Sequence, residues 1–196
     1  MRVKVIGEYG YEQAIFGIGL SYGLTSGLTF ENFTGDDHII NKESPYMRCK
    51  KVAEKLAFRD GGHNKALEHI SVWLDVFGPR YWWQEFDTYR VGTSKQSEST
   101  IHTIMKRELT QDDFEGEIYG CVLHALNADI ESKLFDEVKN ALPEGFLQRR
   151  IVATNYKVLR NMILQRRKHK LPQWQTFIAE VLAQVQQPEL LPGLYE

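Results

Sequence analysis

The sequence predicts a protein of mixed α and β structure, because segments with the period of strands and segments with the period of helices both occur. Residues 1–7 alternate apolar and charged side chains, and residues 70–77 alternate and are rich in β-branched and aromatic side chains, as strands do. Residues 11–22, 46–58 and 174–185 carry apolar side chains near helical spacing. A length of 196 residues predicts one domain, residues 1–196, that can bury a proper core.

The composition is that of an ordinary globular protein, with 42% hydrophobic and 26% charged residues. The formal net charge of −2 provides no global positive field for a nucleic acid polymer. Two cysteines, Cys49 and Cys121, form neither a disulfide framework nor a metal-ligand pattern, so we expect a cytoplasmic protein without a metal site. No apolar run approaches the roughly 18 residues of a membrane span, and we expect no membrane partner and no signal peptide.

Turn-forming residues divide the rest of the chain. Residues 24–44 are rich in Gly, Thr, Asn and Asp and are expected to form a loop. Ser44 and Pro45 predict a helix start with Ser44 as the cap, and Gly78-Pro79 is expected to end the second strand. Further helices are predicted over residues 80–89, 101–109 and 114–134, with a break at Leu142-Pro143 and a tail over residues 188–196.

A bulky aromatic segment is followed directly by a polar one. Tyr81, Trp82, Trp83 and Phe86 are expected to pack in the core or at a subunit interface, or to stack on a flavin. Residues 92–100 are all Gly, Ser, Thr, Lys, Gln or Glu, and we expect them to form a loop. The hydroxyl and backbone N–H groups of such a loop can bind a polyanionic ligand, whereas the alternative is a solvated loop that binds nothing.

Residues 146–170 are interpreted as helical. Asn155 and Asn161 are poor helix formers away from cap positions, so each needs a reason such as a buried hydrogen bond or a ligand. The basic residues from Arg166 to Lys170 either bind an anion or only complement the helix dipole. The expected core residues of this segment are Val152, Leu159, Met162 and Ile163.

In their order along the chain, these motifs resemble the flavin-dependent (alternative) thymidylate synthases. Residues 62–69, GHNKALEH, are similar to the family's G-H-x-S-x-x-E-H segment, with Lys65 where the family prefers Ser or Thr. Residues 88–90 occupy the R-H-R positions, of which only Arg90 is retained. Residues 155–166 are similar to N-x-R-x-L-x-N-x-L-x-L-R, with Lys157 in the place of the middle arginine.

The resemblance implies an α+β fold in which helices flank a twisted, mostly antiparallel sheet, as in a thymidylate synthase-complementing protein. It also implies a homotetramer with flavin sites at subunit junctions. The implied reaction is FAD-dependent reductive methylation of dUMP to dTMP, with methylenetetrahydrofolate as the one-carbon donor and NADPH as the reductant. In such chemistry a flavin supplies the hydride, while the protein supplies position and electrostatics.

The resemblance also implies roles for individual residues. Arg166 and Ser99 would be catalytic, and Lys139 stands where the family has an arginine before its Leu-Pro pair. The implied FAD-binding residues are His63, Lys65, Tyr89, Arg90, Val91, Asn155 and Asn161. The implied dUMP-binding residues are Glu85, Gln96, Ser97, Glu98, Ser99, Lys139, Arg166 and Arg167, where Arg166 and Arg167 are alternatives for one matched arginine.

The departures from the family pattern leave three hypotheses open. Thr88 and Tyr89 replace an arginine and a histidine, which removes up to two positive charges beside the flavin and the substrate. The first hypothesis is a thymidylate synthase acting on dUMP or a related pyrimidine deoxynucleotide. The second is another flavin-dependent one-carbon transfer, such as hydroxymethylation. The third is a catalytically silent nucleotide-binding or assembly subunit of the same fold.

Overall fold

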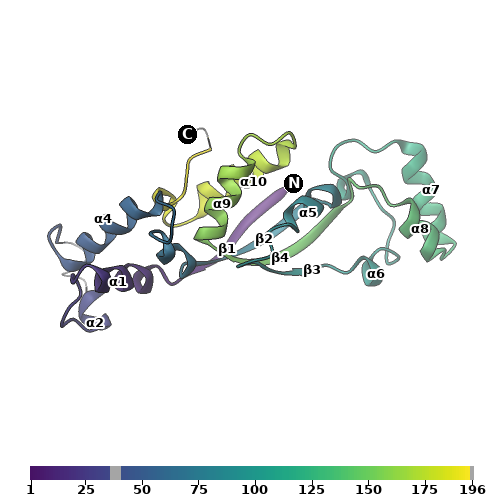
Figure 1. The fold of residues 1–196 in the computed structure, drawn as a ribbon. Helices are drawn as coiled ribbons and strands as arrows, with labels where there is room; N and C mark the ends of the chain where they lie inside the picture. Colours follow the sequence, from purple (N-terminus) through teal and green to yellow (C-terminus); the bar gives the residue numbers. More distant parts are fainter. Residues whose placement is uncertain (36–40, 195–196) are drawn as a thin grey trace.

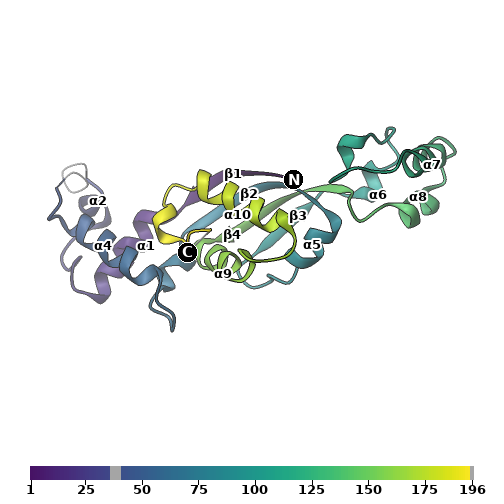
Figure 2. The ribbon, with the colours of Figure 1, turned by 90° about the horizontal axis from the view of Figure 1, so that it is seen from above.

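In the computed structural model, which describes residues 1–35 and 41–194, a four-stranded antiparallel sheet forms the centre of the molecule (Figure 1). The strands are β1 (Arg2–Tyr9), β2 (Ser71–Pro79), β3 (Ser94–Ser97) and β4 (Leu147–Asn155), in the order β1-β2-β4-β3. The helices α5 (Arg80–Phe86), α9 (Tyr156–Arg166) and α10 (Pro172–Gln184) lie over one face of this sheet (Figures 1 and 2). The predicted α+β class with an antiparallel sheet and flanking helices is confirmed.

The molecule is elongated, with a group of helices at each end of the sheet (Figures 1 and 2). One end contains α1 (Tyr11–Ser21), α2 (Phe30–Phe33), α4 (Pro45–Ala57) and the 3₁₀ helices η1 (Lys65–Glu68) and η3 (Pro188–Leu190). The other end contains α6 (Thr100–Thr103), the 3₁₀ helix η2 (Gln111–Asp113), α7 (Gly120–Glu131) and α8 (Phe135–Ala141). This second end has its own small hydrophobic core around Leu126 and Val138, separate from the main core.

Alternation along the strands decides which face of the sheet is covered. On β2, Val72, Leu74 and Val76 are fully buried beneath the helices, whereas Trp73 between them is 43% exposed on the opposite, open face. Burial of three branched apolar side chains on one strand contributes on the order of 1.5–3 kcal/mol each to the hydrophobic stabilisation of the fold. The two-residue period seen in the sequence therefore reflects a sheet with one covered and one open face.

The aromatic segment belongs to the main core of its own chain. Trp82 and Trp83 on α5 are fully buried and their ring centroids are 4.8 Å apart. Trp82 also lies 5.0 Å from the Trp174 ring and 5.4 Å from the Phe177 ring, both on α10. The expectation of core packing is confirmed, and these tryptophans provide no exposed surface for a second subunit.

Two expected segments have a different structure. Part of the polar segment 92–100 is strand β3, because residues 94–97 pair with residues 150–153 of β4. The segment 146–170 begins as strand β4, so Val152 is a buried strand residue and only the part from Tyr156 onwards is helical. The expectation that Asn155 lies away from cap positions is wrong. Asn155 is the N-cap of α9 and accepts a hydrogen bond of 3.0 Å from the Val158 N–H.

Most other boundaries are close to those predicted. Ser44 caps α4 through a 3.2 Å bond from the Met47 N–H, as expected. β2 includes Gly78 and Pro79 and ends at Pro79, so the strand ends at this pair as expected, although the pair still belongs to it. The helices expected over residues 101–109 and 114–134 are shorter, since α6 ends at residue 103 and α7 begins at residue 120. The loop expected over residues 24–44 contains α2, and residues 36–40 of it lie outside the described residues.

Candidate functional site

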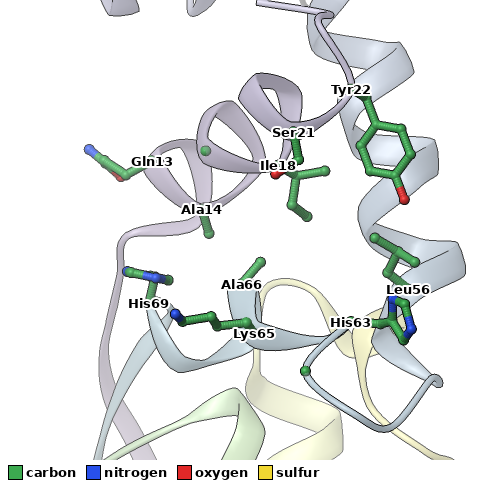
Figure 3. A pocket seen from close by; sticks show the side chains of 12 residues that line it. Gln13, Ala14, Ile18, Ser21, Tyr22, Leu56, His63, Lys65, Ala66 and His69 are labelled. Atoms are coloured by element: carbon green, nitrogen blue, oxygen red, sulfur yellow. The ribbon is translucent and has the colours of Figure 1, made fainter.

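His63 and Lys65 lie on a cavity of about 380 Å³ between α1, α4 and η1 (Figure 3). His63 lies beside Leu56 at one end of the cavity, and Lys65 and His69 lie toward the other end (Figure 3). The remaining lining is both apolar and polar, and comes from Gln13, Ala14, Gly17, Ile18, Ser21, Tyr22, Gly62 and Ala66. A cavity of this size with a few polar groups is the usual form of a small-molecule site.

The backbone before η1 explains how His63 reaches this cavity. Gly61 and Gly62 have φ angles of +72° and +87°, in the left-handed region that glycine adopts without steric cost. The chain therefore turns sharply after α4 and presents His63 as an exposed side chain at the cavity rim. The Gly-Gly-His sequence thus encodes a turn and one exposed ring, although the segment is not the start of an α-helix.

A second group of candidate residues meets at the C-terminal end of α9. Arg166 Nη1 lies 2.5 Å from Glu85 Oε2, and Arg166 Nε donates to the Tyr89 hydroxyl at 2.9 Å. The guanidinium also lies 5.1 Å from the centroid of the Trp174 ring. The structure thus brings together two residues expected to bind dUMP and one expected to bind FAD. Arg167, the alternative arginine, makes no side-chain hydrogen bond or ion pair with the described residues.

Sequence reasoning missed two residues of this cluster. His169 Nε2 lies 3.4 Å from Glu85 Oε2, while its Nδ1 accepts a 3.2 Å bond from the Leu171 N–H. Gln175 Nε2 donates to the carbonyl oxygens of Arg167 and His169 at 3.1 and 3.0 Å, which satisfies carbonyls that the end of α9 leaves open. The sequence signal at this place is the basic run after Arg166, which predicts a set of helix-end charges and not the turn that the structure forms.

Arg90 and Val91 lie on the loop between α5 and β3, and both side chains are exposed, Val91 by 90%. The loop is fixed at its next residue, because Thr154 Oγ1 donates to the Gly92 carbonyl at 3.3 Å. A Cβ atom on Gly92 would lie only 3.1 Å from Asn155 Nδ2, and the φ angle of Gly92 is +71°. The loop is therefore packed tightly against the N-cap residue of α9, which places Arg90 and Asn155 in one neighbourhood.

The expected substrate segment lies along the edge strand β3. Gln96, Ser97 and Glu98 line a hollow of about 570 Å³ together with Phe77, Arg149 and Ile151 from the neighbouring strands. Ser99 is the N-terminal flanking residue of α6. Lys139 on α8 reaches the next residue, donating to Thr100 Oγ1 at 2.6 Å. Lys139 therefore contacts the residue next to Ser99. Neither Lys139 nor Ser99 forms a hydrogen bond with Arg166 among the described residues.

On the covered side of the same edge, an ion-pair network joins α5 to β3 and β4. Asp87 accepts bonds from Lys95 Nζ at 2.7 Å and from Arg150 Nη1 at 2.9 Å, and the Arg150 guanidinium lies 4.4 Å from the Trp83 ring centroid. Burial alone would raise the pKa of the Asp87 carboxyl, but hydrogen bonds from Lys95 and Arg150 outweigh burial and hold the pKa below its usual value. Lys95 is therefore committed to a structural pair.

The candidate residues of one chain thus form four groups: at the cavity, at Arg166, on the loop beside Asn155, and along β3 with Lys139. Asn161 joins none of them and is a half-buried residue of α9. Within the parts of the chain that the structure describes, no cluster of three or more His, Cys, Asp or Glu side chains has the arrangement of a metal site. No helix in those same parts is long and apolar enough to cross a membrane.

Comparisons with known proteins find similarity in the fold and not in the sequence. No family model matches the sequence, and no curated protein matches it. The fold is similar to a solved structure of flavin dependent thymidylate synthase ThyX from Helicobacter pylori complexed with FAD and dUMP, with a TM-score of 0.74 and 18% identity. That similarity covers 97% of this chain and 98% of the other.

A second structure of thymidylate synthase X from Helicobacter pylori, also with FAD and dUMP, has a TM-score of 0.71 at 18% identity. It covers 100% of this chain and 95% of the other, so both end groups and the sheet are included in the similarity. The fold implied by the resemblance in sequence motifs is thus found over the whole length. This chain has the fold of the flavin-dependent thymidylate synthases, at a sequence identity that marks it as divergent from both of these proteins.

Proposed function

We propose that this protein binds FAD and a pyrimidine deoxynucleotide and catalyses a flavin-dependent transfer of a one-carbon unit, with dUMP as substrate and dTMP as product. The observation that carries this proposal is the fold similarity over the full length of two enzymes solved with FAD and dUMP. Because folds host many functions, the proposal depends on whether the residues of this chain suit these ligands.

The residues at the cavity suit part of a dinucleotide such as FAD. Lys65 can pair with a phosphate as a point charge, and His63 and Gln13 offer polar ring and amide groups at the rim. Apolar lining from Ala14 and Ile18 suits the flat face of an aromatic ring. The cavity is smaller than the whole cofactor, so Arg90 and Val91 on the loop before β3 and Asn155 at the N-cap of α9 are proposed to hold the remainder.

When bound, FAD would supply the hydride that reduces the transferred carbon, and methylenetetrahydrofolate and NADPH are the proposed donor and reductant. The residues of this chain would position the substrate. Arg166, held by Glu85 and Tyr89, presents a fixed planar guanidinium that can donate to the oxygens of a pyrimidine. Lys139 and Ser99 lie together and can hold a phosphate that carries about −2 near neutral pH.

A complete site would need residues from more than one subunit. The cavity with His63, the cluster at Arg166 and the edge strand with Ser99 do not converge within one chain, although all three would have to act on one substrate. We therefore propose a homotetramer with shared sites. The buried Trp82 and Trp83 give no support for it. The open face of the sheet, with Ile6 47% exposed and Trp73 43% exposed beside the Arg149–Asp75 ion pair, combines apolar and charged groups as subunit interfaces do.

Sedimentation equilibrium at micromolar protein concentration tests the assembly. The proposal predicts a mass of four chains. A Trp73→Lys variant should shift it toward smaller species, while Tyr119→Lys, at a more exposed aromatic (81%) in the end group that contains α7, should not. A wild-type protein that sediments as a monomer would contradict the shared site.

A second candidate is hydroxymethylation of the nucleotide. The observation that favours it is Tyr89, which stands at a position where the resembled family has histidine and which uses its hydroxyl to hold Arg166. A mass-spectrometric assay with dUMP, methylenetetrahydrofolate and NADPH separates the candidates. Formation of dTMP supports the first, and hydroxymethyl-dUMP supports the second. No product in spite of bound FAD and dUMP would leave a nucleotide-binding subunit.

A further inference from the structure

Arg160 is an unusual residue in the middle of α9. Its side chain is only 6% exposed and lies in a helix whose neighbouring residues Leu159 and Met162 belong to the hydrophobic core. Its Nε atom is buried and has no hydrogen-bond partner among the described residues. Burying a charged group with an unsatisfied donor opposes folding, so a position in the core would ordinarily be occupied by an apolar side chain.

The contacts of Arg160 all lead to one segment, residues 58–64, which connects α4 to η1 and which we call the 58–64 loop. Arg160 Nη1 lies 3.0 Å from Asp60 Oδ1, and Nη2 is 3.4 Å from the Phe58 carbonyl oxygen. The Asp60 side chain is 84% exposed, so the ion pair joins a buried cation to a surface carboxylate. The guanidinium therefore reaches from the core to the loop and fixes its first half.

Lys157, one turn earlier on α9, fixes the second half of the same loop. Its Nζ donates to Asn64 Oδ1 and lies 3.8 Å from Glu68 Oε1. Asn64 is 1% exposed, and its Nδ2 is 3.4 Å from the Ala57 carbonyl oxygen at the end of α4. Two basic side chains from α9 thus hold both ends of a loop that contains turns but no helix or strand.

Between these two attachments lies the Gly61-Gly62 turn, which presents His63 to the cavity. We propose that Arg160 is a positioning residue: through Asp60 it fixes the 58–64 loop on α9 and thereby sets the distance between His63 and the polar residues at the start of α9. This rests on the proposed function, since its effect on binding requires that FAD occupies the cavity. Arg160 does not contact the cavity itself, and its effect passes through the loop.

The experiment uses the full-length protein and two readouts, hydrogen exchange of the amides in the 58–64 loop and the Kd for FAD by fluorescence titration. Arg160→Met, Asp60→Asn and the double variant are compared with Asp112→Asn, an equally conservative change at an exposed aspartate on the opposite end group. Because Asp60 is largely exposed, Asp60→Asn should fold even if Arg160→Met does not.

Asp60→Asn and Arg160→Met are each expected to speed exchange in the loop and to raise the Kd for FAD about fivefold, equivalent to about 1 kcal/mol. The double variant should be no worse than Arg160→Met alone, because both changes remove one interaction, and Asp112→Asn should change neither readout. Unchanged exchange in Asp60→Asn, or faster exchange with an unchanged Kd, would overturn the positioning role. If the wild type takes up no FAD, the proposed function fails while the exchange measurement still decides whether Arg160 holds the loop.

Discussion

Arg166 and Glu85 form an ion pair between the last turn of α9 and the C-terminal end of α5, with 2.5 Å between Nη1 and Oε2. The Arg166 side chain is 17% exposed and that of Glu85 36%, so the pair lies at the edge of the protein and not deep in its core. Tyr89 and Trp174 hold the guanidinium from two further sides. A side chain fixed from three directions loses little entropy when it binds a ligand, which is how a recognition arginine is preorganised.

Replacing Arg166 separates ligand binding from helix-end stabilisation. Arg166→Ala is expected to weaken dUMP binding by about 1.5–3 kcal/mol, the range for a charge-assisted hydrogen bond. Arg167→Ala is the matched control, because Arg167 is the neighbouring arginine without such contacts, and it should cost only a few tenths of a kcal/mol in stability. Calorimetric titration with dUMP, beside thermal unfolding, measures both. Equal loss of affinity in the two variants would refute the assignment of Arg166.

Asn155 has a capping role that can be separated from a role in binding. Asn155→Ala removes the acceptor for the Val158 N–H and should lower the free energy of unfolding by about 1 kcal/mol. Asn155→Ser retains an N-cap oxygen and should retain most of that stability, but it lacks the amide nitrogen that packs beside Gly92. If this amide also contacts FAD, Asn155→Ser should weaken FAD binding while unfolding in urea is nearly unchanged. Parallel losses in both measurements would mean that Asn155 is only a cap.

The stability of the folded protein should depend on pH in the acid range through the carboxyl of Asp87. Its pKa is below the ordinary value of 3.8 in the folded protein, so the folded state favours the ionised carboxylate. The resulting stabilisation is fully present above the unfolded-state pKa and is lost as the pH falls through the folded-state pKa. Between about pH 5 and pH 2, wild type should therefore lose stability more steeply than Asp87→Asn, whereas above pH 5 their difference should be constant. Parallel denaturation curves across that acid range would show that the network contributes nothing.

The sequence predicted best those features that depend on local chemistry. The alternation over residues 70–77 predicted a strand, which the structure contains as β2, and Ser44 before Pro45 predicted the start of α4. The wrong expectation of a loop over residues 92–100 has a non-local cause. Ser94 to Ser97 has no strand propensity of its own and becomes β3 because β4 offers a free edge with which its backbone can pair.

The candidate site residues remain a prediction from sequence motifs, and their grouping in space could not be predicted from the sequence. His63 and Lys65 were identified from a short motif, and the structure places both on the same cavity because the Gly61-Gly62 turn fixes their direction. His169 was missed because its contact with Glu85 depends on the turn after α9 and on a residue 84 positions earlier, which no local pattern encodes. The burial of Arg160 could not be predicted from the sequence either, since an arginine in the middle of a helix is usually on the surface.

Titration of the folded protein with FAD is the decisive experiment for the proposed flavin binding. We expect saturable binding with a flavin absorbance band on the purified complex. We also expect that Arg90→Ala, a change at an exposed side chain, weakens binding by about 1.5–3 kcal/mol without unfolding the protein. A folded wild-type protein that takes up no FAD at any concentration would rule out FAD binding by this chain.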